Sequence, residues 1–279
     1  MKKIIIILGV VGTAFSAILV RYSDAPSTVL VFYRMLFAVL MISPVAVSHR
    51  KEISGILPKD VLMCIISGIF LGIHFTCYFQ SLKYTSIASS VVLVDTEVFF
   101  VALGGMVFLH EKVSGKGWIG IVITFVGSVI VAMGDAGGGK LLGDILALCG
   151  AVCSAVYTLI GRKCRERMST TMYTWIVYFC AGAVVLFASI FTGNTILHCS
   201  LRNLLVALGL TVFCTFLGHS IFSWGLKYEK SSFISTVKLL EPVFSVAMGA
   251  MLFGEIPTVS SIAGGIVIIG GIVLCIWAS

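Results

Sequence analysis

The sequence is poor in charged residues. Asp, Glu, Lys and Arg together make up 11% of its 279 residues, whereas a soluble domain has about 25%. Hydrophobic residues make up 59%, and the mean hydropathy is +1.11. The scarcity of charge excludes an ordinary soluble domain, and the excess of apolar residues indicates an all-α polytopic membrane protein.

The sequence also lacks the short motifs of most catalytic and metal sites. It contains no CxxC pair, no HExxH, no GxSxG and no glycine-rich phosphate loop. Most of the nine cysteines lie inside apolar runs, and only Cys164 and Cys199 fall near loops. We interpret them as small buried hydrophobes, and we expect no cofactor, no metal ion and no enzymatic activity. A membrane-embedded enzyme or a channel stays open as the alternative function.

Ten apolar spans follow one another along the chain, joined by short connections. They cover roughly residues 4–20, 28–48, 61–82, 87–109, 117–133, 143–161, 172–192, 203–225, 231–253 and 260–277. The basic N-terminus resembles the start of a signal peptide, but its apolar run continues to Val20 and is long enough for a membrane helix. The sequence therefore predicts ten transmembrane helices without a separate soluble domain.

The net charge of +7 is explained by topology. When both termini are placed in the cytoplasm, most of the 19 Lys and Arg residues fall on the cytoplasmic side, while Arg34 and Lys238 fall within spans. The positive-inside rule favours this orientation. We therefore expect a multi-pass protein of the bacterial cytoplasmic membrane with both termini inside, and no nucleic acid partner.

The second half of the chain repeats the first. Residues 82–111 align with residues 226–255 without a gap, so that Glu97 coincides with Glu241. Glycines recur in the spans that follow, at seven-residue spacing in each, and predict close helix packing.

The repeat extends towards the start of each half. The triplet around Ser16 resembles the triplet around Ser154. The two repeats are then residues 1–134 and 143–279, with five spans each. Because five is odd, the second repeat crosses the membrane inverted, and inverted repeats place a binding site between the halves near the middle of the membrane.

The ninth span, residues 231–253, carries a polar stripe. Lys238 and Glu241 lie on one face of an otherwise apolar helix, and Pro242 cannot donate a hydrogen bond to the carbonyl of Lys238. A charge deep in a membrane costs about 2.5–3.5 kcal/mol, so such residues usually face a bundle interior or a wet cavity. We predict that Lys238 and Glu241 bind substrate or couple transport. The alternative is an ion pair that only locks two helices together.

Several motifs resemble those of the EamA-type branch of the drug/metabolite transporter superfamily. They are Phe32-Tyr33-Arg34, the runs GIHFTCYFQSLKYTS and LLEPVFSVAMGAMLFGE, and the closing GGIVIIGGIVL. The resemblance covers the whole chain as two repeats. It implies a ten-helix bundle around a central cavity, with the fifth and tenth helices at the periphery. It also implies export or exchange of small organic metabolites such as amino acids, sugars or nucleotide derivatives.

One position departs from the pattern of these relatives, which usually have proline after the acid position in both halves. Here Val98 stands where Pro242 stands in the second half. We therefore expect the fourth helix to be less bent than the ninth. The fourth span also carries two acids, Asp95 and Glu97, where typical relatives have neutral residues.

Glu97 and Glu241 are mates in the repeat and are predicted to lie about halfway across the membrane, on the fourth and ninth spans. A carboxylate in apolar surroundings can load and release a proton, so Glu97 and Glu241 are predicted to couple transport to protons or to bind a cation. The structural alternative is a partner for Lys238 or Arg34. Asp95 is two residues from Glu97, which is about 200° around a helix. We therefore expect Glu97 rather than Asp95 to face the cavity, with Asp95 free to pair with Arg34.

The remaining candidate residues are cationic or aromatic. Arg34 is expected to form a structural pair, and the alternative is an anchor for a substrate carboxylate or phosphate. His74 and His219, on the third and eighth spans, are predicted either to relay protons or to bond across helices. Tyr78, one turn beyond His74, and Trp224 either line a cavity or belong to the interfacial aromatic belt.

Glu111 and Glu255 end the fourth and ninth spans. Ser114 and Thr258 follow three residues later and are predicted to cap the next helices. An acid near a helix N-terminus is favoured by the helix dipole, so both glutamates are expected to be structural.

Taken together, these patterns predict a secondary transporter that works by alternating access. Its expected cargo is a small, amino acid-like metabolite that is exported or exchanged. The expected partners are this small molecule, the lipid bilayer and protons.

Overall fold

A computed structural model describes residues 2–85, 87–133, 141–196, 199–253 and 257–278. Within these ranges the chain is helical and contains no strand, which confirms the predicted all-α class. In chain order the helices are α1 (Lys2–Arg21), α2 (Ser27–Ser48), the 3₁₀ segment η1 (Arg50–Gly55), α3 (Pro58–Tyr84), α4 (Ile87–Asp95), α5 (Glu97–Phe108), α6 (Gly115–Met133), α7 (Leu141–Cys164), α8 (Thr170–Phe191), α9 (Leu201–Gly209), the π-helix η2 (Leu210–Ser220), α10 (Ile221–Gly225), α11 (Ser231–Lys238), α12 (Glu241–Phe253) and α13 (Val259–Ala278).

These helices account for the ten predicted spans. In the described part of the chain, nine stretches are long and apolar enough to cross a membrane, and α6 contributes a shorter apolar helix, Gly115–Val131. The fourth span consists of α4 and α5, the eighth of α9, η2 and α10, and the ninth of α11 and α12.

The ninth span is interrupted at Leu239 and Leu240, between α11 and α12. Proline explains this break, because Pro242 has no N–H to donate to the carbonyl of Lys238. The interruption leaves Lys238 as the last residue of one short helix and Glu241 as the first residue of the next.

The fourth span is interrupted as well, at Thr96, although Val98 replaces the proline there. The Thr96 hydroxyl donates to the carbonyl of Leu93 at 2.5 Å. Back-bonding of this kind bends helices. The break covers one residue instead of two, and a threonine accompanies it instead of a proline.

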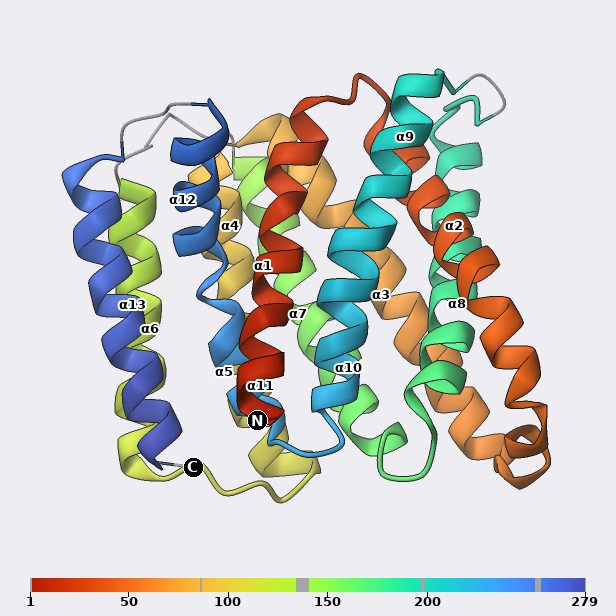
Figure 1. Ribbon diagram of the computed structural model, residues 1–279, viewed down its shortest axis with the longest axis horizontal. Coiled ribbons are helices and arrows are strands. Elements are labelled where there is room, and N and C mark those ends of the chain that lie inside the picture. The colour runs from red at the N-terminus through yellow and green to blue at the C-terminus, as the bar shows by residue number, and fades with distance from the viewer. Residues whose placement is uncertain (1, 86, 134–140, 197–198, 254–256, 279) are drawn as a thin grey trace.

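The ten spans form a bundle in which α6 and α13 stand side by side at one edge, the periphery that the family resemblance implied (Figure 1). Their backbones touch: a Cβ atom added at Gly127 would lie 2.9 Å from the carbonyl oxygen of Gly264, and one at Gly264 would lie 2.7 Å from that of Gly127. The structure therefore confirms that these glycines permit close packing.

Equivalent helices make equivalent contacts in the two halves. α3 packs along α7, and η2 packs along α1. These pairs are the third span against the sixth and the eighth span against the first. In each half, therefore, the third span packs along the first span of the other half, as two five-helix repeats related by inversion should do. The repeat limits 1–134 and 143–279 stay predictions, and residues 134–140 between them lie outside the described residues.

The largest hydrophobic core lies among α2, α3, α7, α8 and η2. Two tyrosines of α8 are fully buried in it, and their hydroxyls meet partners: Tyr173 lies 2.8 Å from the Ser67 hydroxyl and Tyr178 lies 2.9 Å from the Ser220 hydroxyl. Buried phenols need such partners. This core fixes α2 and η2 against each other beside the pocket described below.

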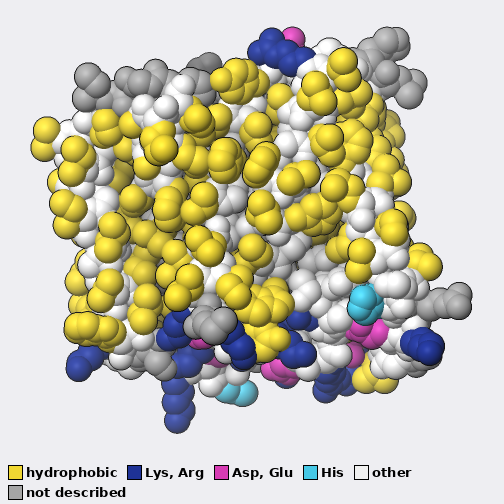
Figure 2. Space-filling view, viewed as in Figure 1, with side chains coloured by type: hydrophobic (Ala, Val, Ile, Leu, Met, Phe, Trp, Pro, Cys, Tyr) yellow, Lys and Arg dark blue, Asp and Glu magenta, His cyan; other side chains and the backbone are white. Residues whose placement is uncertain are grey.

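The molecule presents a broad apolar surface to its surroundings. Figure 2 shows hydrophobic side chains over most of the visible face and most of the visible Lys and Arg side chains along one edge, with a smaller group at the opposite edge. The first of these edges is the end of the bundle where α1 begins and α13 ends (Figure 1), here called the terminal face. The protein is therefore an integral, multi-pass membrane protein.

Candidate functional site

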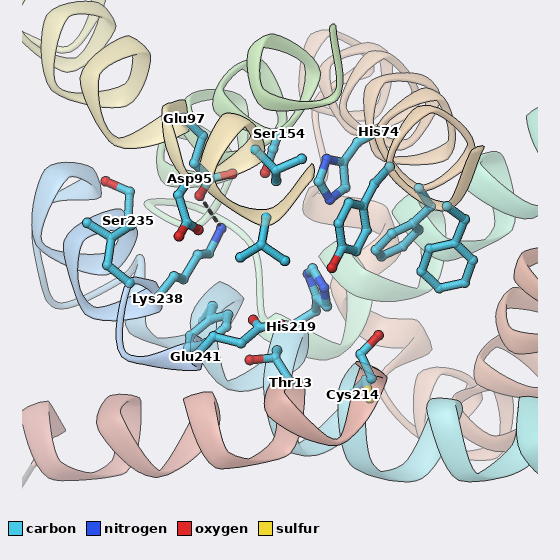
Figure 3. Close-up of a pocket in the computed structure, with 18 of the residues that line it drawn as sticks. Thr13, His74, Asp95, Glu97, Ser154, Cys214, His219, Ser235, Lys238 and Glu241 are labelled. Carbon is cyan, nitrogen blue, oxygen red and sulfur yellow. Dashed lines mark hydrogen bonds and ion pairs between the residues drawn. The ribbon is translucent and has the colours of Figure 1, made fainter. Parts of the chain in front are cut away.

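A pocket of about 80 Å³ lies between the two halves, beside the breaks in the fourth and ninth spans (Figure 3). Its lining includes residues of α1, α2, α3, α4, α5, α7, η2 and α11. Eight of the predicted site residues line it: Arg34, His74, Tyr78, Asp95, Glu97, His219, Lys238 and Glu241. The ninth does not: Trp224 packs its ring against Tyr228, with centroids 4.9 Å apart.

An ion pair joins the halves inside this pocket. Lys238 Nζ of α11 lies 2.7 Å from Glu97 Oε1 of α5. The two side chains are 14% and 7% exposed, so solvent screens their attraction little. Lys238 ends α11 and Glu97 begins α5, so each charge also complements the dipole of its own helix. Lys238 therefore pairs with the acid of the other half rather than with Glu241 of its own span.

Both acids of the fourth span line the pocket, which corrects the expectation that Glu97 alone would face it. In a continuous helix the two acids would point about 200° apart. The helix is interrupted at Thr96, between them, so this angle does not apply. Asp95 Oδ2 accepts a hydrogen bond of 2.6 Å from the Ser128 hydroxyl of α6. Asp95 therefore has its partner on α6, and the suggested pair with Arg34 does not form.

Glu241 is the first residue of α12, at the positive end of that helix dipole. It lies beside Thr13 of α1 in the pocket (Figure 3). Among the residues that the structure describes, no Lys, Arg or His comes within ion-pair distance of it. Glu97 and Glu241 are thus mates in the repeat with different surroundings: one carries a cation partner and the other does not.

Arg34 lies in α2 and is 2% exposed. Its Nε donates to the Thr215 hydroxyl at 2.8 Å, and its guanidinium carbon lies 4.3 Å from the centroid of the Phe75 ring. In the described ranges no carboxylate pairs with it, which corrects the expected structural pair.

The two histidines have different environments. His74 Nδ1 lies 2.9 Å from the Gly150 carbonyl oxygen, so this nitrogen carries a proton, and the contact ties α3 to α7. The His74 ring is parallel to the Tyr78 ring, with centroids 6.2 Å apart. His219 Nδ1 is buried and has no hydrogen-bond partner, while the ring meets Phe75 edge-on at 5.1 Å. Of the two predicted roles for His74, proton relay and a hydrogen bond across helices, the structure shows the hydrogen bond.

Several lining residues were not among the predicted site residues. They are Thr13, Ser16, Phe75, Phe79, Val91, Val94, Ser154, Cys214, Phe222, Ser235 and Leu239. For three of them the signal was present in the sequence. Ser16 and Ser154 occupy matching places in the repeat, and matching polar residues on apolar helices point to a shared interior face. Ser235 likewise belongs to the polar stripe of the ninth span.

The described residues include no group of three or more His, Cys, Asp or Glu side chains placed to hold a metal ion. Two of the three pocket acids instead contact Lys238 and Ser128.

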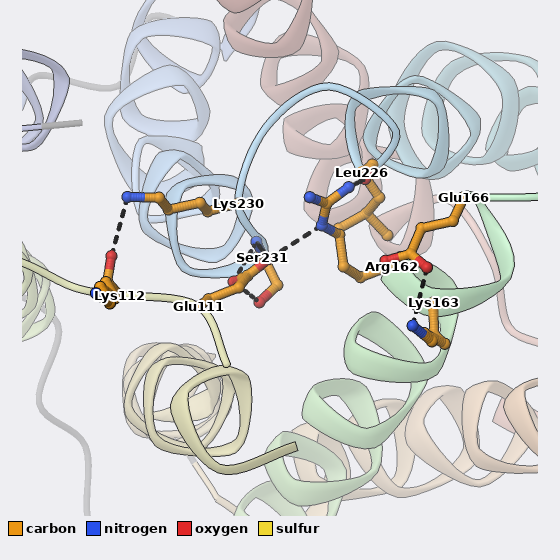
Figure 4. Close-up of polar contacts among 8 residues, drawn as sticks. All are labelled: Glu111, Lys112, Arg162, Lys163, Glu166, Leu226, Lys230 and Ser231. Carbon is orange, nitrogen blue, oxygen red and sulfur yellow. Dashed lines mark hydrogen bonds and ion pairs between the residues drawn. The ribbon is translucent and has the colours of Figure 1, made fainter. Parts of the chain in front are cut away.

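The halves meet again at the terminal face (Figure 4). Arg162 Nε, at the end of α7, donates to Glu111 Oε1 at 3.0 Å, and Arg162 Nη1 donates to the Leu226 carbonyl at 2.6 Å. Glu111 Oε2 accepts from the Ser231 hydroxyl at 2.7 Å and from the Ser231 N–H at 3.0 Å. Glu111 therefore lies at the start of α11, in the other half, rather than at the start of the helix that follows it. We call these four residues the terminal seam.

The helix caps nearby agree with the sequence. Gly117 N–H donates to the Ser114 hydroxyl at 3.1 Å, and Ser261 N–H donates to the Thr258 hydroxyl at 3.1 Å, which confirms both predicted caps. Glu255, the mate of Glu111, lies outside the described residues.

Hydrogen bonds also link the halves at the opposite end of the bundle. Asn203 Nδ2 of α9 donates to Asp24 Oδ1 at 2.7 Å, and the Ser23 hydroxyl donates to Asn203 Oδ1 at 2.9 Å. The bond from Asn203 is the main cause that lowers the pKa of Asp24 below its ordinary value.

The chain is similar in sequence to known transporters and similar in fold to a solved structure. The model of the EamA-like transporter family matches residues 2–133 and again residues 141–277. The Pseudopaline exporter CntI of Pseudomonas aeruginosa (strain UCBPP-PA14) is 22% identical over 246 residues, which cover 88% of this chain and 84% of that protein. An uncharacterized transporter of Archaeoglobus fulgidus is 27% identical over 288 residues, 97% of each chain. A solved crystal structure has the same fold, with a TM-score of 0.80, 16% sequence identity, and coverage of 99% of this chain and 97% of that one.

Proposed function

Because the chain belongs to the EamA-like transporter family, we propose that it is a secondary transporter that exports or exchanges a small organic metabolite by alternating access. The protein is a membrane transporter, and the proposal concerns its mechanism, direction and cargo. We place it in the cytoplasmic membrane with the terminal face inside, because Lys and Arg gather at that face (Figure 2).

The observation that carries the proposal is the Lys238–Glu97 ion pair. It lies in a pocket between inverted halves, at two broken helices, with Asp95 and Glu241 beside it. Secondary transporters bind their cargo in this kind of place. Charged residues at membrane depth are costly, and their presence here supports a functional site.

The size of the pocket supports alternating access. At about 80 Å³ it has room for a few water molecules, whereas small-molecule sites usually measure about 300–1,000 Å³. The cargo therefore binds in a conformation in which the halves stand further apart. The terminal seam, in which Glu111 bonds to Arg162 and Ser231, is the contact that has to open for access from the terminal face.

We propose that Glu241 is the acid that couples transport to protons. It lines the pocket and has no cation partner among the described residues, whereas Glu97 is held by Lys238. A carboxylate without a fixed counter-charge can exchange a proton for a cargo cation in one cycle.

An amino acid-like cargo fits the mixed charge of the lining. The pocket holds cations and carboxylates within one small space, so a molecule that carries both signs finds a partner for each. Export as the direction is supported by the similarity to the exporter from Pseudomonas aeruginosa.

The test is release from proteoliposomes. Vesicles that contain the purified protein are loaded with amino acids, polyamines, sugars and nucleosides, and released compounds are identified by mass spectrometry with and without a pH gradient. We expect saturable release of one class, its loss in Lys238→Met, and release without any response to the gradient in Glu241→Gln. Lys163→Gln is the matched control, because Lys163 is exposed and pairs only with Glu166 in the described residues. Release by Lys238→Met at the wild-type rate, or no release by the wild type, contradicts the proposal.

A further inference from the structure

We infer that Arg34 is the receptor for a carboxylate group of the cargo, with His219 beside it as a second donor. The inference rests on the proposed function and deepens it, since it assigns one chemical group of the cargo to one place in the pocket.

Arg34 is held so that only part of its guanidinium is satisfied. Its backbone carbonyl accepts from the Thr211 hydroxyl at 2.9 Å, and its Nε donates to the Thr215 hydroxyl at 2.8 Å. Both threonines belong to the π-helix η2, and one face of the guanidinium is covered by the Phe75 ring. These contacts fix the side chain between α2 and η2, and Arg34 lines the pocket.

One outer nitrogen of the Arg34 guanidinium has no hydrogen-bond partner. This atom, Arg34 Nη2, is buried, and the residue as a whole is only 2% exposed. In the described part of the chain no carboxylate pairs with it. Guanidinium carries five N–H donors and no acceptor, and a buried charge without a partner is strongly unfavourable. An oxyanion bound in the pocket would supply the missing partner.

His219 supplies the second observation, and it is independent of the first. Its Nδ1 is also buried without a partner, and it lines the same pocket from η2. Its ring is held edge-on by Phe75 at 5.1 Å and by Phe222 at 6.3 Å. Thr215 and His219 lie four residues apart on η2, so the helix that anchors Arg34 also carries His219. Two unsatisfied polar atoms thus belong to residues on different helices that line one pocket.

The other cation of the pocket is occupied. Lys238 already contacts Glu97 at 2.7 Å, so an incoming anion would have to displace that carboxylate. Arg34 has no such competitor among the described residues. A forked guanidinium also binds a planar carboxylate through two parallel bonds, which an ammonium does not.

Charge balance selects a carboxylate over a phosphate. Arg34 and Lys238 face three acids, Asp95, Glu97 and Glu241, so the ionised lining has a formal charge of −1. A zwitterion adds nothing to this charge, whereas a phosphate dianion would increase it to −3 in a site with little water. The carboxylate then lies at Arg34, and an ammonium group lies at Asp95 or Glu241.

The first experiment requires no mutation. The loaded vesicles described above also receive the α-amide of each amino acid, which keeps size and ammonium group but has no carboxylate. We expect the wild type to release the free acid at least about 10-fold faster than its amide, since a charge-assisted bidentate contact is worth about 10–100-fold in affinity. Equal release of acid and amide, or release restricted to polyamines, sugars or nucleosides, overturns the inference but leaves the transporter proposal standing. No release of any compound overturns both.

Variants then locate the group. Arg34→Gln is expected to abolish the preference for acid over amide, and Arg34→Lys to reduce it while retaining the charge. Lys163→Gln should keep the wild-type preference. If Arg34→Gln does not fold, as judged by gel filtration, Arg34→Lys and His219→Phe still report the preference. A preference for acid over amide that is unchanged in every folded Arg34 variant overturns the inference.

Discussion

The Lys238–Glu97 pair allows a quantitative test of whether two charges in this pocket stabilise the protein, perform transport, or do both. Glu97 is buried, so Lys238→Met leaves a buried carboxylate without its cation. Breaking a buried pair in this way costs about 3–5 kcal/mol. The double variant Lys238→Met/Glu97→Gln removes both charges, and we expect it to be more stable than Lys238→Met by about 1–3 kcal/mol.

The assay is equilibrium unfolding in mixed micelles of a mild detergent and SDS, followed by tryptophan fluorescence. Wild type, both single variants and the double variant complete a double-mutant cycle. Lys163 and Glu166 form the control cycle, because their pair has the same chemistry at 2.9 Å but is 51% and 43% exposed. The coupling energy of that surface pair should stay near 0.3–0.5 kcal/mol, about the value of exposed helix pairs.

Transport by the same proteins separates the two roles. A folded double variant that has lost transport supports a coupling or binding role, since stability has been restored without the charges. A double variant that transports at the wild-type rate refutes that role and leaves the pair as a lock between helices. A Lys238–Glu97 coupling no larger than that of the surface pair refutes the reasoning about burial.

Three further outcomes follow from single contacts. Glu111→Gln weakens the terminal seam, so the rate of amide hydrogen exchange at the start of α11 should rise about 10–100-fold, measured by mass spectrometry. Glu166→Gln, which removes an acid from an exposed pair, should leave this rate unchanged. Gly271→Ala places a methyl group 2.7 Å from a backbone nitrogen of α6 and should cost about 1–3 kcal/mol in SDS unfolding, whereas Gly270→Ala meets no atom within 4 Å and should be neutral. Trp224→Phe should release cargo at the wild-type rate, because this ring does not line the pocket.

The spans and the pocket's main residues could be predicted from the sequence because both depend on local patterns. Apolar runs of about 20 residues define membrane helices wherever they occur. Charges within such runs are expensive, so Lys238, Glu97 and Glu241 stand out without any knowledge of their neighbours. Eight of the nine predicted site residues do line the pocket.

The partners of those residues could not be predicted, because a helical pattern says which face a residue occupies but not which helix lies opposite. Lys238 meets Glu97 across 141 residues of sequence, and Arg34 meets Thr215 across 181. Asp95 finds Ser128, a residue that no motif marked. Each of these contacts depends on how the two halves are rotated against each other, which tertiary packing decides.

The break at Thr96 shows a second limit of sequence patterns. Proline is a visible signal for an interrupted helix, and its absence at Val98 favoured a straighter one. A hydroxyl that bonds back to the Leu93 carbonyl accompanies an interruption at the same level without such a signal. The interruption lies between Asp95 and Glu97, and both acids line the pocket.

The pocket is asymmetric although the fold is built from a repeat, and Lys238 is one of the positions at which the two halves differ. In the ungapped alignment Lys238 coincides with Val94, and both line the pocket. The lysine side chain reaches across to Glu97 of the opposite half, and no lysine is available at the matching place to reach Glu241. A symmetric pocket with two such pairs would hold two satisfied carboxylates and no acid free to exchange its counter-ion. With lysine in one half and valine in the other, the pocket holds one paired acid, Glu97, and one acid without a cation partner among the described residues, Glu241, which is the acid that we propose to couple transport to protons.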